Sequence, residues 1–598
     1  MSATKKVLAA SLTGLLALLL SVGGASAAAG TYSVKTLHFD VVVGPNDDTH
    51  CDIIGDLYTP DSASPSHRLP AILTTNGFGG SKDDQADIGS YGAAHGYVVL
   101  SYSGLGFGGS GCKITLDDRD WDGKAGSQLV SFLGGGGAAK DGTTVNYVKR
   151  DRRGSDGRRH AHDPRVGMIG GSYGGQIQFA IAAIDPRLDT IIPIITWNDL
   201  SYSLAPNNTS FVPKTVSTRT PGVEKYQWTS LFFGLGVADG LSGIGADPTR
   251  NVGCPNFTQD ACTIKAEMDT LGYPSPAATA FARHASVGSF IDKIRIPTML
   301  MQGEGDTLFN LQESVSTYRG LRKRGVPVRL IWQSWGHSDG SPAPGEFGDP
   351  ILTKTYEGRL VLRWFNHFLR HRGPRPKMNF EFFRDWIHYK GIAKPAYGKE
   401  RRFMSHPRTP YYLSGNGSLV SARSAVSAGT ARLVAPSGGA PSSYSETSAV
   451  EPGNPVSDTN GTFASFSTDP ISGRSLRLVG IPQVTLNLSA PSNQASQGSD
   501  AGKLVLFFKL YDVAPDGSIT LPNRLISPVR VPDVTRPLKV QLPGIVHRVP
   551  VGHHLELVIA GGDSAYRGNN ASSAVTITVD PADPGVLQLP IVPRHHGR

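Results

Sequence analysis

Long apolar runs are absent from this sequence beyond its first residues, and no later segment is long and apolar enough to span a bilayer. The one such run, residues 7–22, follows Lys5 and Lys6 and precedes small residues at 25–29 that offer cleavage sites. A membrane anchor is the alternative, but the run is short and polar residues interrupt it. We therefore predict a signal peptide over 1–29 and a secreted protein without membrane attachment after cleavage.

Cysteine is scarce as well, with four in 598 residues, and none stands in a local signature of a catalytic cysteine. An even, sparse set in an oxidising compartment favours disulfides, and four cysteines allow three pairings. Cys254 and Cys262 are close together in a stretch rich in Gly, Pro and Asn. We predict that these two pair, which leaves Cys51 to pair with Cys112.

Complete metal-binding and nucleic-acid-binding patterns are also missing. Much of the formal net charge of +9 lies in a polar loop, 148–165, without aromatics or a reading helix. No carboxylate or cysteine pattern completes a metal site around His160 and His162, and the acidic run 117–122 lacks the Gly and closing Glu of a calcium loop. We expect no cofactor, no metal and no nucleic-acid partner, and the sequence leaves the oligomeric state open.

What the sequence does contain is an alternation of strands and helices in its first part. Buried parallel strands are short, continuous apolar runs, and helices separate them here. The predicted strands are 34–43, 51–59, 69–76, 97–103, 165–169, 190–197, 295–303 and 327–335, and the clearest helices are 124–133, 175–184 and 355–371. This order predicts a doubly wound α/β sheet. The alternation stops at about 198–291, where we predict an inserted cap of helices and loops.

The last part of the chain reads differently. After a linker at 372–377, apolar and polar residues alternate with period two, between turns rich in Gly, Pro, Ser and Asn. The pattern is clearest in 484–488, 555–559 and 575–579. We therefore predict an α/β domain over 30–375 and a β-sandwich domain over 376–598.

A candidate nucleophile follows the strand 165–169. Residues 170–174, Gly-Gly-Ser-Tyr-Gly, match G-x-S-x-G, in which a sharp strand-to-helix turn presents the serine hydroxyl. A plain glycine turn is the alternative, and the five-residue match alone is common by chance. Its position between a strand and a helix favours Ser172 as the nucleophile.

A serine needs a base, and the base needs an orienting acid. Asp306 directly follows strand 295–303, and His337 directly follows strand 327–335, which is the order Ser, acid, His expected for such a sheet. Taken alone, Asp306 could be an aspartate that caps a turn, and His337 could be a histidine in a surface loop. Together they predict a catalytic triad, with Glu304 and Asp339 as the alternative acids.

Acyl transfer also needs two hydrogen-bond donors for the oxyanion. We predict the backbone N–H of Tyr173, next to the nucleophile, and Phe78 in the glycine-rich loop 76–82 after an early strand. The alternative for Phe78 is an aromatic plug that packs a turn.

At this point the chain resembles the X-Pro dipeptidyl-peptidase and cocaine-esterase-like α/β-hydrolases. In the first domain the resemblance rests on 76-NGF-78, 103-SGLGFGGSG-111, 167-GMIGGSYGG-175, 303-GEGD-306 and 336-GH-337. In the second it rests on 478-LVGIPQVTLNL-488, 503-KLVLFFKLYDVAPDG-517 and 552-GHHLELVI-559, which look like the family's C-terminal jelly roll.

The resemblance implies an α/β-hydrolase fold, a helical cap over the site and a serine hydrolase that uses Ser172, Asp306 and His337. Some relatives place a tyrosine hydroxyl in the oxyanion hole, at the position that aligns with Phe78. Phenylalanine has no such donor, so we expect only its backbone N–H to serve.

The substrate is the least determined feature. A dipeptidyl-peptidase must hold a substrate ammonium, and Asp199 is the candidate carboxylate, although it could instead cap the first cap helix. An esterase needs only an apolar acyl pocket, for which the cap supplies Trp228, Phe232 and Phe233. We therefore expect a small ester or peptide as substrate, cleaved at an ester or amide bond.

A non-catalytic function is the alternative from another class. Jelly rolls often carry sugar-binding sites, so the second domain could bind carbohydrate or cell wall beside a vestigial triad. Against it stands the presence of every element that the chemistry requires, in the expected order.

Overall fold

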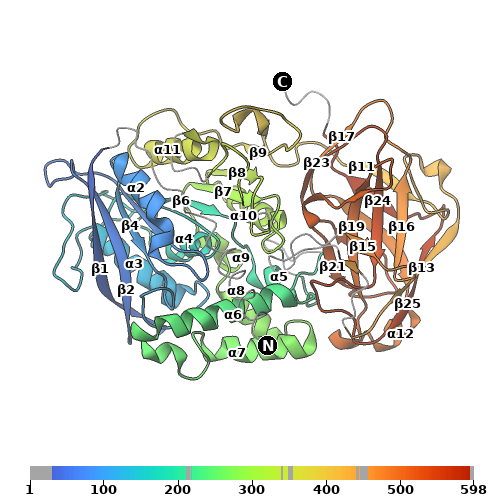
Figure 1. The fold of residues 1–598 in the computed structure, drawn as a ribbon, viewed down its shortest axis with the longest axis horizontal. Helices are drawn as coiled ribbons and strands as arrows, with labels where there is room; N and C mark the ends of the chain where they lie inside the picture. Colours follow the sequence, from blue (N-terminus) through green and yellow to red (C-terminus); the bar gives the residue numbers. More distant parts are fainter. Residues whose placement is uncertain are drawn as a thin grey trace, which may run out of the picture.

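The computed structural model describes residues 30–209, 216, 218–338, 341–347, 354–438, 443–444 and 456–592. An α/β part and an all-β part lie side by side along the long axis of the molecule (Figure 1). Helices α6 (Tyr226–Ser242) and α7 (Gln259–Leu271) run along one edge, below the sheet of the α/β part. The predicted signal peptide, 1–29, lies outside the described residues.

The α/β part is built on a ten-stranded sheet in the order β1-β2-β4-β3-β5-β6-β7-β8-β9-β10. The run from β4 to β9 is parallel, and β1, β2 and β10 pair antiparallel at the edges. The strands are β1 (Tyr32–Val43), β2 (Thr49–Pro60), β3 (Ala71–Thr75), β4 (Val98–Tyr102), β5 (Val166–Gly171), β6 (Leu188–Ile194), β7 (Thr298–Gly303), β8 (Val328–Gln333), β9 (Phe380–Phe382) and β10 (Gly398–Glu400).

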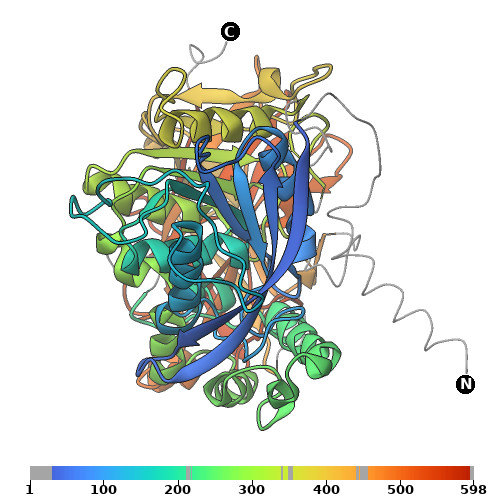
Figure 2. The ribbon, with the colours of Figure 1, turned by 90° about the vertical axis from the view of Figure 1, so that its left-hand side faces the viewer.

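Helices cover both faces of this sheet, which Figure 2 shows from the side of β1 and β2. They are α2 (Ala86–Ala94), α3 (Lys124–Leu133), α4 (Tyr173–Ile184), α10 (Leu311–Lys323) and α11 (Tyr356–Phe368). Alternate residues of one buried strand enter different cores: Met168 belongs to the core that includes residues of α3, α4 and α10, and Ile169 belongs to the core that includes residues of α2 and α11. A strand that is buried on both faces has to be apolar throughout, as these strands are. The predicted doubly wound α/β fold is confirmed.

The sheet extends further along the chain than we predicted. Strands β9 and β10 follow residue 375, the predicted end of the domain, and β9 pairs in parallel with β8. A strand of three residues is too short to show a period-two pattern, which explains why the sequence did not reveal it.

The helices between β6 and β7 form the cap, within the predicted range 198–291. They are α5 (Leu200–Leu204), α6, α7, α8 (Pro276–His284) and α9 (Val287–Phe290). Among the described helices of the chain, α6 included, none combines the length and the hydropathy that a membrane crossing requires.

The all-β part forms the β-sandwich over residues 409–589. In β18 (Gln483–Ser489), Val484, Leu486 and Leu488 are buried and alternate with more exposed polar residues, as the sequence predicted. The other strands are β11 (Thr409–Leu413), β12 (Ser418–Val420), β13 (Gly429–Ala435), β14 (Ser443–Tyr444), β15 (Ser457–Asp458), β16 (Phe463–Thr468), β17 (Leu476–Gly480), β19 (Val505–Val513), β20 (Ile519–Thr520), β21 (Ser527–Arg530), β22 (Leu538–Gln541), β23 (Ile545–Val549), β24 (His554–Ala560), β25 (Ser573–Val579) and β26 (Val586–Leu589), with one short helix, α12 (Pro491–Ser496).

Both predicted disulfides are present. Cys51 of β2 bonds to Cys112 in the loop after β4, and Cys254 bonds to Cys262 in the first turns of α7. The first bond therefore ties the edge of the sheet to a glycine-rich loop, and the second ties a cap loop to a cap helix.

The two disulfides should differ in how much they stabilise the fold. Sequence separations of 61 and 8 residues give loop-closure contributions of about 4 and about 2.5 kcal/mol. We expect scanning calorimetry to show a larger decrease in Tm for the variant C51S/C112S than for the variant C254S/C262S. An equal or reversed loss would contradict the loop-entropy explanation.

Candidate active site

Ser172 occupies the turn between β5 and α4 in a strained backbone conformation. Its φ of 56° and ψ of −119° lie outside the regions that a residue with a side chain ordinarily adopts. The Ser172 N–H donates to the carbonyl of Ile194 at 2.9 Å, which fixes the turn against the end of β6. The hydroxyl is therefore presented at the carboxyl edge of the sheet, where sites of α/β proteins form.

The glycines around Ser172 are required by close backbone approaches. A Cβ on Gly170 would lie 2.6 Å from the Gly174 carbonyl oxygen, and one on Gly174 would lie 2.4 Å from the Thr75 carbonyl oxygen. Both distances are shorter than real Cβ contacts, so any larger residue would push the turn open. The G-x-S-x-G spacing is thus a consequence of how tightly α4 meets the ends of β3 and β5.

The predicted triad residues meet in space although they are far apart in the sequence. His337 Nε2 lies 2.9 Å from Ser172 Oγ, and His337 Nδ1 lies 2.8 Å from Asp306 Oδ2. Asp306 is fully buried and His337 is largely buried. The geometry is that of a hydroxyl whose proton can pass to an imidazole, with a carboxylate on the other ring nitrogen.

The loop after β7 holds Asp306 in place. Asp306 Oδ1 accepts hydrogen bonds from the N–H groups of Leu308 at 3.0 Å and Phe309 at 2.7 Å, which leaves Oδ2 for His337. The loops of Asp306 and His337 cross closely, because a Cβ on Gly336 would lie 2.7 Å from that of Asp306. The Gly-His sequence at 336–337 is therefore needed for the contact.

The alternative acids do not compete with Asp306 in the described structure. Glu304 is buried, and its Oε1 accepts from the Phe383 N–H at 3.1 Å, next to β9. Burial, with Glu346 and Asp385 nearby, holds the pKa of Glu304 well above its usual range. Asp339 lies outside the described residues.

Both predicted oxyanion donors stand beside Ser172. Tyr173 is the first residue of α4, and a Cβ on Gly77 would lie 3.8 Å from that of Ser172, which brings the Phe78 loop next to the nucleophile. The ring of Phe78 packs edge-on against Phe107 at 5.2 Å, so it also acts as the packing plug considered as its alternative.

Two groups that the sequence patterns did not reveal anchor the side chain of Tyr173. Its hydroxyl accepts from the Asp117 N–H at 2.9 Å and donates to Asp122 Oδ2 at 3.3 Å, and all three residues are buried. Burial raises the pKa of Asp122 to about 7. Their signal in the sequence is the acidic run 117–122, whose pattern alone suggests no more than an incomplete calcium loop.

An apolar cavity of about 140 Å³ opens at Ser172 and extends between the cap helices. Aromatic and aliphatic side chains make up most of its lining, and Lys265 is the only charged residue among them. The lining comprises Phe78, Leu116, Ser172, Tyr173, Trp197, Leu200, Ser201, Leu204, Thr229, Phe232, Phe233, Phe257, Ala261, Ile264, Lys265, Met268, Pro274, Ala278, Phe281, Ala282 and Phe309.

The two predicted substrate-binding residues do not line this cavity. Asp199 is buried and caps α5, accepting from the Ser201 N–H at 2.9 Å, and it pairs with Arg283 at 3.3 Å. This contact pattern matches the capping alternative. Trp228 lies behind Phe232, with ring centroids 5.5 Å apart, and its Nε1 donates to Thr307 Oγ1 at 3.2 Å. Trp228 thus supports the cavity wall from behind.

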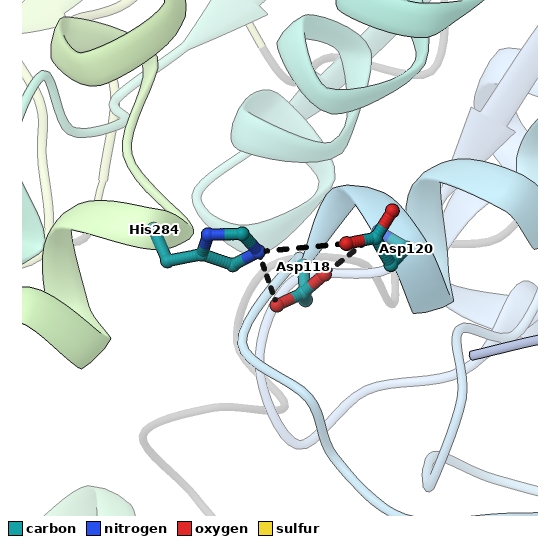
Figure 3. Close-up of side chains that lie close together, drawn as sticks. All are labelled: Asp118, Asp120 and His284. Atoms are coloured by element: carbon teal, nitrogen blue, oxygen red, sulfur yellow. Dashed lines mark hydrogen bonds and ion pairs between the residues drawn. The ribbon is translucent and has the colours of Figure 1, made fainter. Parts of the chain in front are cut away.

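A small charged group joins the cap to the α/β part near the cavity (Figure 3). His284 Nε2, at the end of α8, lies 3.1 Å from Asp118 Oδ2 and 3.7 Å from Asp120 Oδ2. In the part of the chain that the structure describes, this is the one cluster with three potential metal ligands. Asp118 Oδ1 also accepts from the Asp120 N–H at 2.7 Å and so caps the turn Arg119–Gly123.

Comparison with known proteins gives two family matches in chain order. Residues 51–339 match the X-Pro dipeptidyl-peptidase (S15 family) model, and residues 399–588 match the X-Pro dipeptidyl-peptidase C-terminal non-catalytic domain. A search of curated proteins finds no match.

Solved structures share the fold over nearly the whole chain. An alpha-amino acid ester hydrolase superposes with a TM-score of 0.60 at 15% identity, covering 96% of this chain and 98% of its own. A CocE/NonD family hydrolase from Staphylococcus aureus gives 0.57 at 14% identity, with 96% and 99% covered. An aminopeptidase from a marine sediment Thaumarchaeota archaeon gives 0.56 at 13% identity, with the same coverage.

The two family models span the sheet, the cap and the β-sandwich in the order found here, and the similar structures have the same two-part fold. The chain therefore belongs to the X-Pro dipeptidyl-peptidase (S15) family of α/β-hydrolases, and it is a hydrolase of the serine type.

Proposed function

We propose that this protein is a secreted hydrolase that cleaves ester or amide bonds through an acyl-enzyme on Ser172, with a preference for esters of apolar acids. The observation that carries the substrate preference is the cavity at Ser172, whose lining includes no carboxylate among the described residues. The substrate is thus a small ester or peptide, and the chemistry requires no group beyond those of the chain.

The contacts of His337 define the proposed reaction. Ser172 Oγ attacks the substrate carbonyl as His337 Nε2 takes its proton, and the N–H groups of Tyr173 and Phe78 face the oxyanion. His337 then gives that proton to the departing alcohol or amine. A water molecule attacks the acyl group in the second half, with His337 again as base and then as acid. Asp306 keeps the Nδ1 proton directed toward itself and stabilises the imidazolium.

The lining of the cavity argues against a substrate with a free α-ammonium. Such a group would need a carboxylate at a fixed distance from Ser172, because an unpaired charge is costly to bury. Asp199 is already engaged with α5 and Arg283, and the one charged lining residue, Lys265, is a cation paired with Asp269 at 2.5 Å. An uncharged acyl group has no such requirement.

The oxyanion donors also favour esters. Backbone N–H groups are the donors proposed here, since Phe78 provides no hydroxyl. An alcohol leaves with less help from a proton than an amine does, so an ester places a smaller demand on this site.

Two structural disulfides support the proposed secretion. Cys51–Cys112 and Cys254–Cys262 use all four cysteines, and such bonds persist in oxidising compartments. The apolar run at 7–22 supplies the proposed export signal.

Ser172→Ala should abolish covalent labelling by a fluorophosphonate probe and lower ester turnover by at least about 10³-fold, because no other group replaces the nucleophile. Ser201→Ala is the matched control, since Ser201 also lines the cavity. Gel fluorescence and a p-nitrophenyl ester assay measure both. Undiminished labelling of the Ser172 variant would rule out this nucleophile.

Asp306→Asn should lower kcat by about 10⁴-fold, because an amide favours the wrong imidazole tautomer. Glu304→Gln should change kcat little, because Glu304 Oε1 accepts from the Phe383 N–H rather than contacting His337, and a glutamine oxygen can accept the same bond. Steady-state kinetics of the two variants distinguishes the acids. A larger loss of kcat in the Glu304 variant than in the Asp306 variant would identify Glu304 as the acid that orients His337.

Phenyl butyrate should be cleaved roughly a hundredfold more efficiently than phenyl 2-aminobutyrate, which differs only by the α-ammonium, because the cavity offers that charge no partner. Ala-Pro-p-nitroanilide should be poorer still. Asp199→Asn should leave these preferences within about twofold, since asparagine also caps helices. Efficient dipeptide release that collapses in Asp199→Asn would make the protein a dipeptidyl-peptidase instead.

A further inference from the structure

The far wall of the cavity is built by cap helices that bury little surface of their own. In the thirteen residues of α7 only Met268 is buried, and in the nine residues of α8 only Ala278 is. Both side chains line the cavity, as does Pro274 in the turn between the helices, residues 272–275, called here the cap corner. Helices with so little packing need support from outside to hold a fixed position.

The Cys254–Cys262 disulfide supports the start of α7, and the β-sandwich supports its end. Arg530 of β21 is 2% exposed, and its guanidinium donates to the carbonyls of Gly222 at 3.3 Å and Gly272 at 3.5 Å. The same group lies over the ring of Tyr273, 4.5 Å from its centroid. One buried cation from the β-sandwich therefore holds both residues that precede Pro274.

A second arginine of the β-sandwich acts on the neighbouring turns. Arg567 lies 3.5 Å from Asp269 in the last turn of α7 and 3.6 Å from Glu224 just before α6. Its backbone N–H donates to the Glu224 carbonyl at 3.0 Å, and its guanidinium lies over the ring of Tyr226. Asp269 in turn pairs with Lys265, which lines the cavity.

The cap corner is shaped to meet this arginine. Gly272 ends α7 with a φ of +73°, and a Cβ on it would lie 3.1 Å from Cβ of Arg567. A side chain at this position would be strained by the backbone and would press on the β-sandwich. The close approach of the two parts is therefore built into the sequence at Gly272.

We propose that the β-sandwich determines the acyl specificity of the enzyme, with Arg530 and Arg567 as positioning residues that hold the cap corner and so set the depth of the cavity. The inference rests on the proposed function, since it concerns the acyl group that the cavity takes. It assigns the second domain a part in substrate selection, in addition to any part in stability. An acetyl group ends beside Ser172, whereas a hexanoyl chain continues into the cavity toward the corner.

The test compares Arg530→Met, Arg567→Gln and a control, Arg536→Gln, on the full chain. Arg536 is on the same β-sandwich, its side chain is 82% exposed, and it pairs only locally with Asp533. Hydrogen–deuterium exchange over 259–284 measures the support of the helices without requiring activity. Kinetics on p-nitrophenyl acetate and hexanoate measures the depth of the cavity.

We expect faster exchange over 259–284 in both test variants, with the turn around Ser172 unchanged. The ratio of kcat/KM for hexanoate to that for acetate should fall at least about fivefold, because the KM for hexanoate rises. The loosened wall loses contact with the last methylenes of the hexanoyl group. Arg567→Gln removes fewer contacts than Arg530→Met, so it remains informative if the Arg530 variant does not fold. The control should match the wild type.

Unchanged exchange over 259–284, or an unchanged ratio beside faster exchange, would overturn the inference and leave the proposed esterase function intact. An equal loss on both esters would also overturn it, because general destabilisation does not discriminate chain length. A wild type that hydrolyses neither ester, while Arg530→Met still loosens the helices, would contradict the proposed function and this inference with it.

Discussion

The rest of the site depends on the strained backbone of Ser172. A φ of 56° is tolerated because contacts on both sides of the turn hold it in place. The Ser172 N–H donates to the Ile194 carbonyl, and Gly174 lies close against the Thr75 carbonyl. The same turn starts α4 and so directs the Tyr173 N–H toward the proposed oxyanion position. It also places Ser172 Oγ where the loops after β7 and β8 deliver Asp306 and His337. Relaxing this one turn would separate all of these groups.

Buried polar groups then fix the loops around the turn. On one side Asp122 and the Asp117 N–H hold the Tyr173 hydroxyl. On the other, Glu346 accepts from the Ser334 N–H, three residues before His337, and the Tyr397 hydroxyl bridges Glu346 and Glu357. Burial raises the pKa of both glutamates. A buried polar group without a hydrogen-bond partner costs free energy, so these networks favour the one arrangement in which their groups are paired.

The shared fold does not decide which bond is cut. Solved structures at 13 to 15% identity have the same two-part architecture and are described as an ester hydrolase and an aminopeptidase. The sheet positions the proposed nucleophile, acid and base, while the cap supplies much of the cavity wall. In this chain those walls are apolar, and the carboxylate that could have held an ammonium caps a helix. We therefore assign the proposed substrate choice to the cap and to the contacts that hold the cap in place.

The sequence by itself determined the features that follow from local patterns. Apolar runs gave the buried strands, G-x-S-x-G between a strand and a helix gave Ser172, and the positions after two later strands gave Asp306 and His337. These residues meet in space because parallel strands end at one edge of the sheet, so the residues that follow different strands lie together there. Only the tertiary structure decided the features that depend on distant partners. Asp199 could be an anchor or a cap until Arg283 and α5 were seen around it. Strands β9 and β10 have three residues each, and they form because β9 pairs with the edge of β8 and β10 then pairs with β9. The contacts of Arg530 with the cap corner join residues more than two hundred positions apart, a separation at which no local pattern carries information.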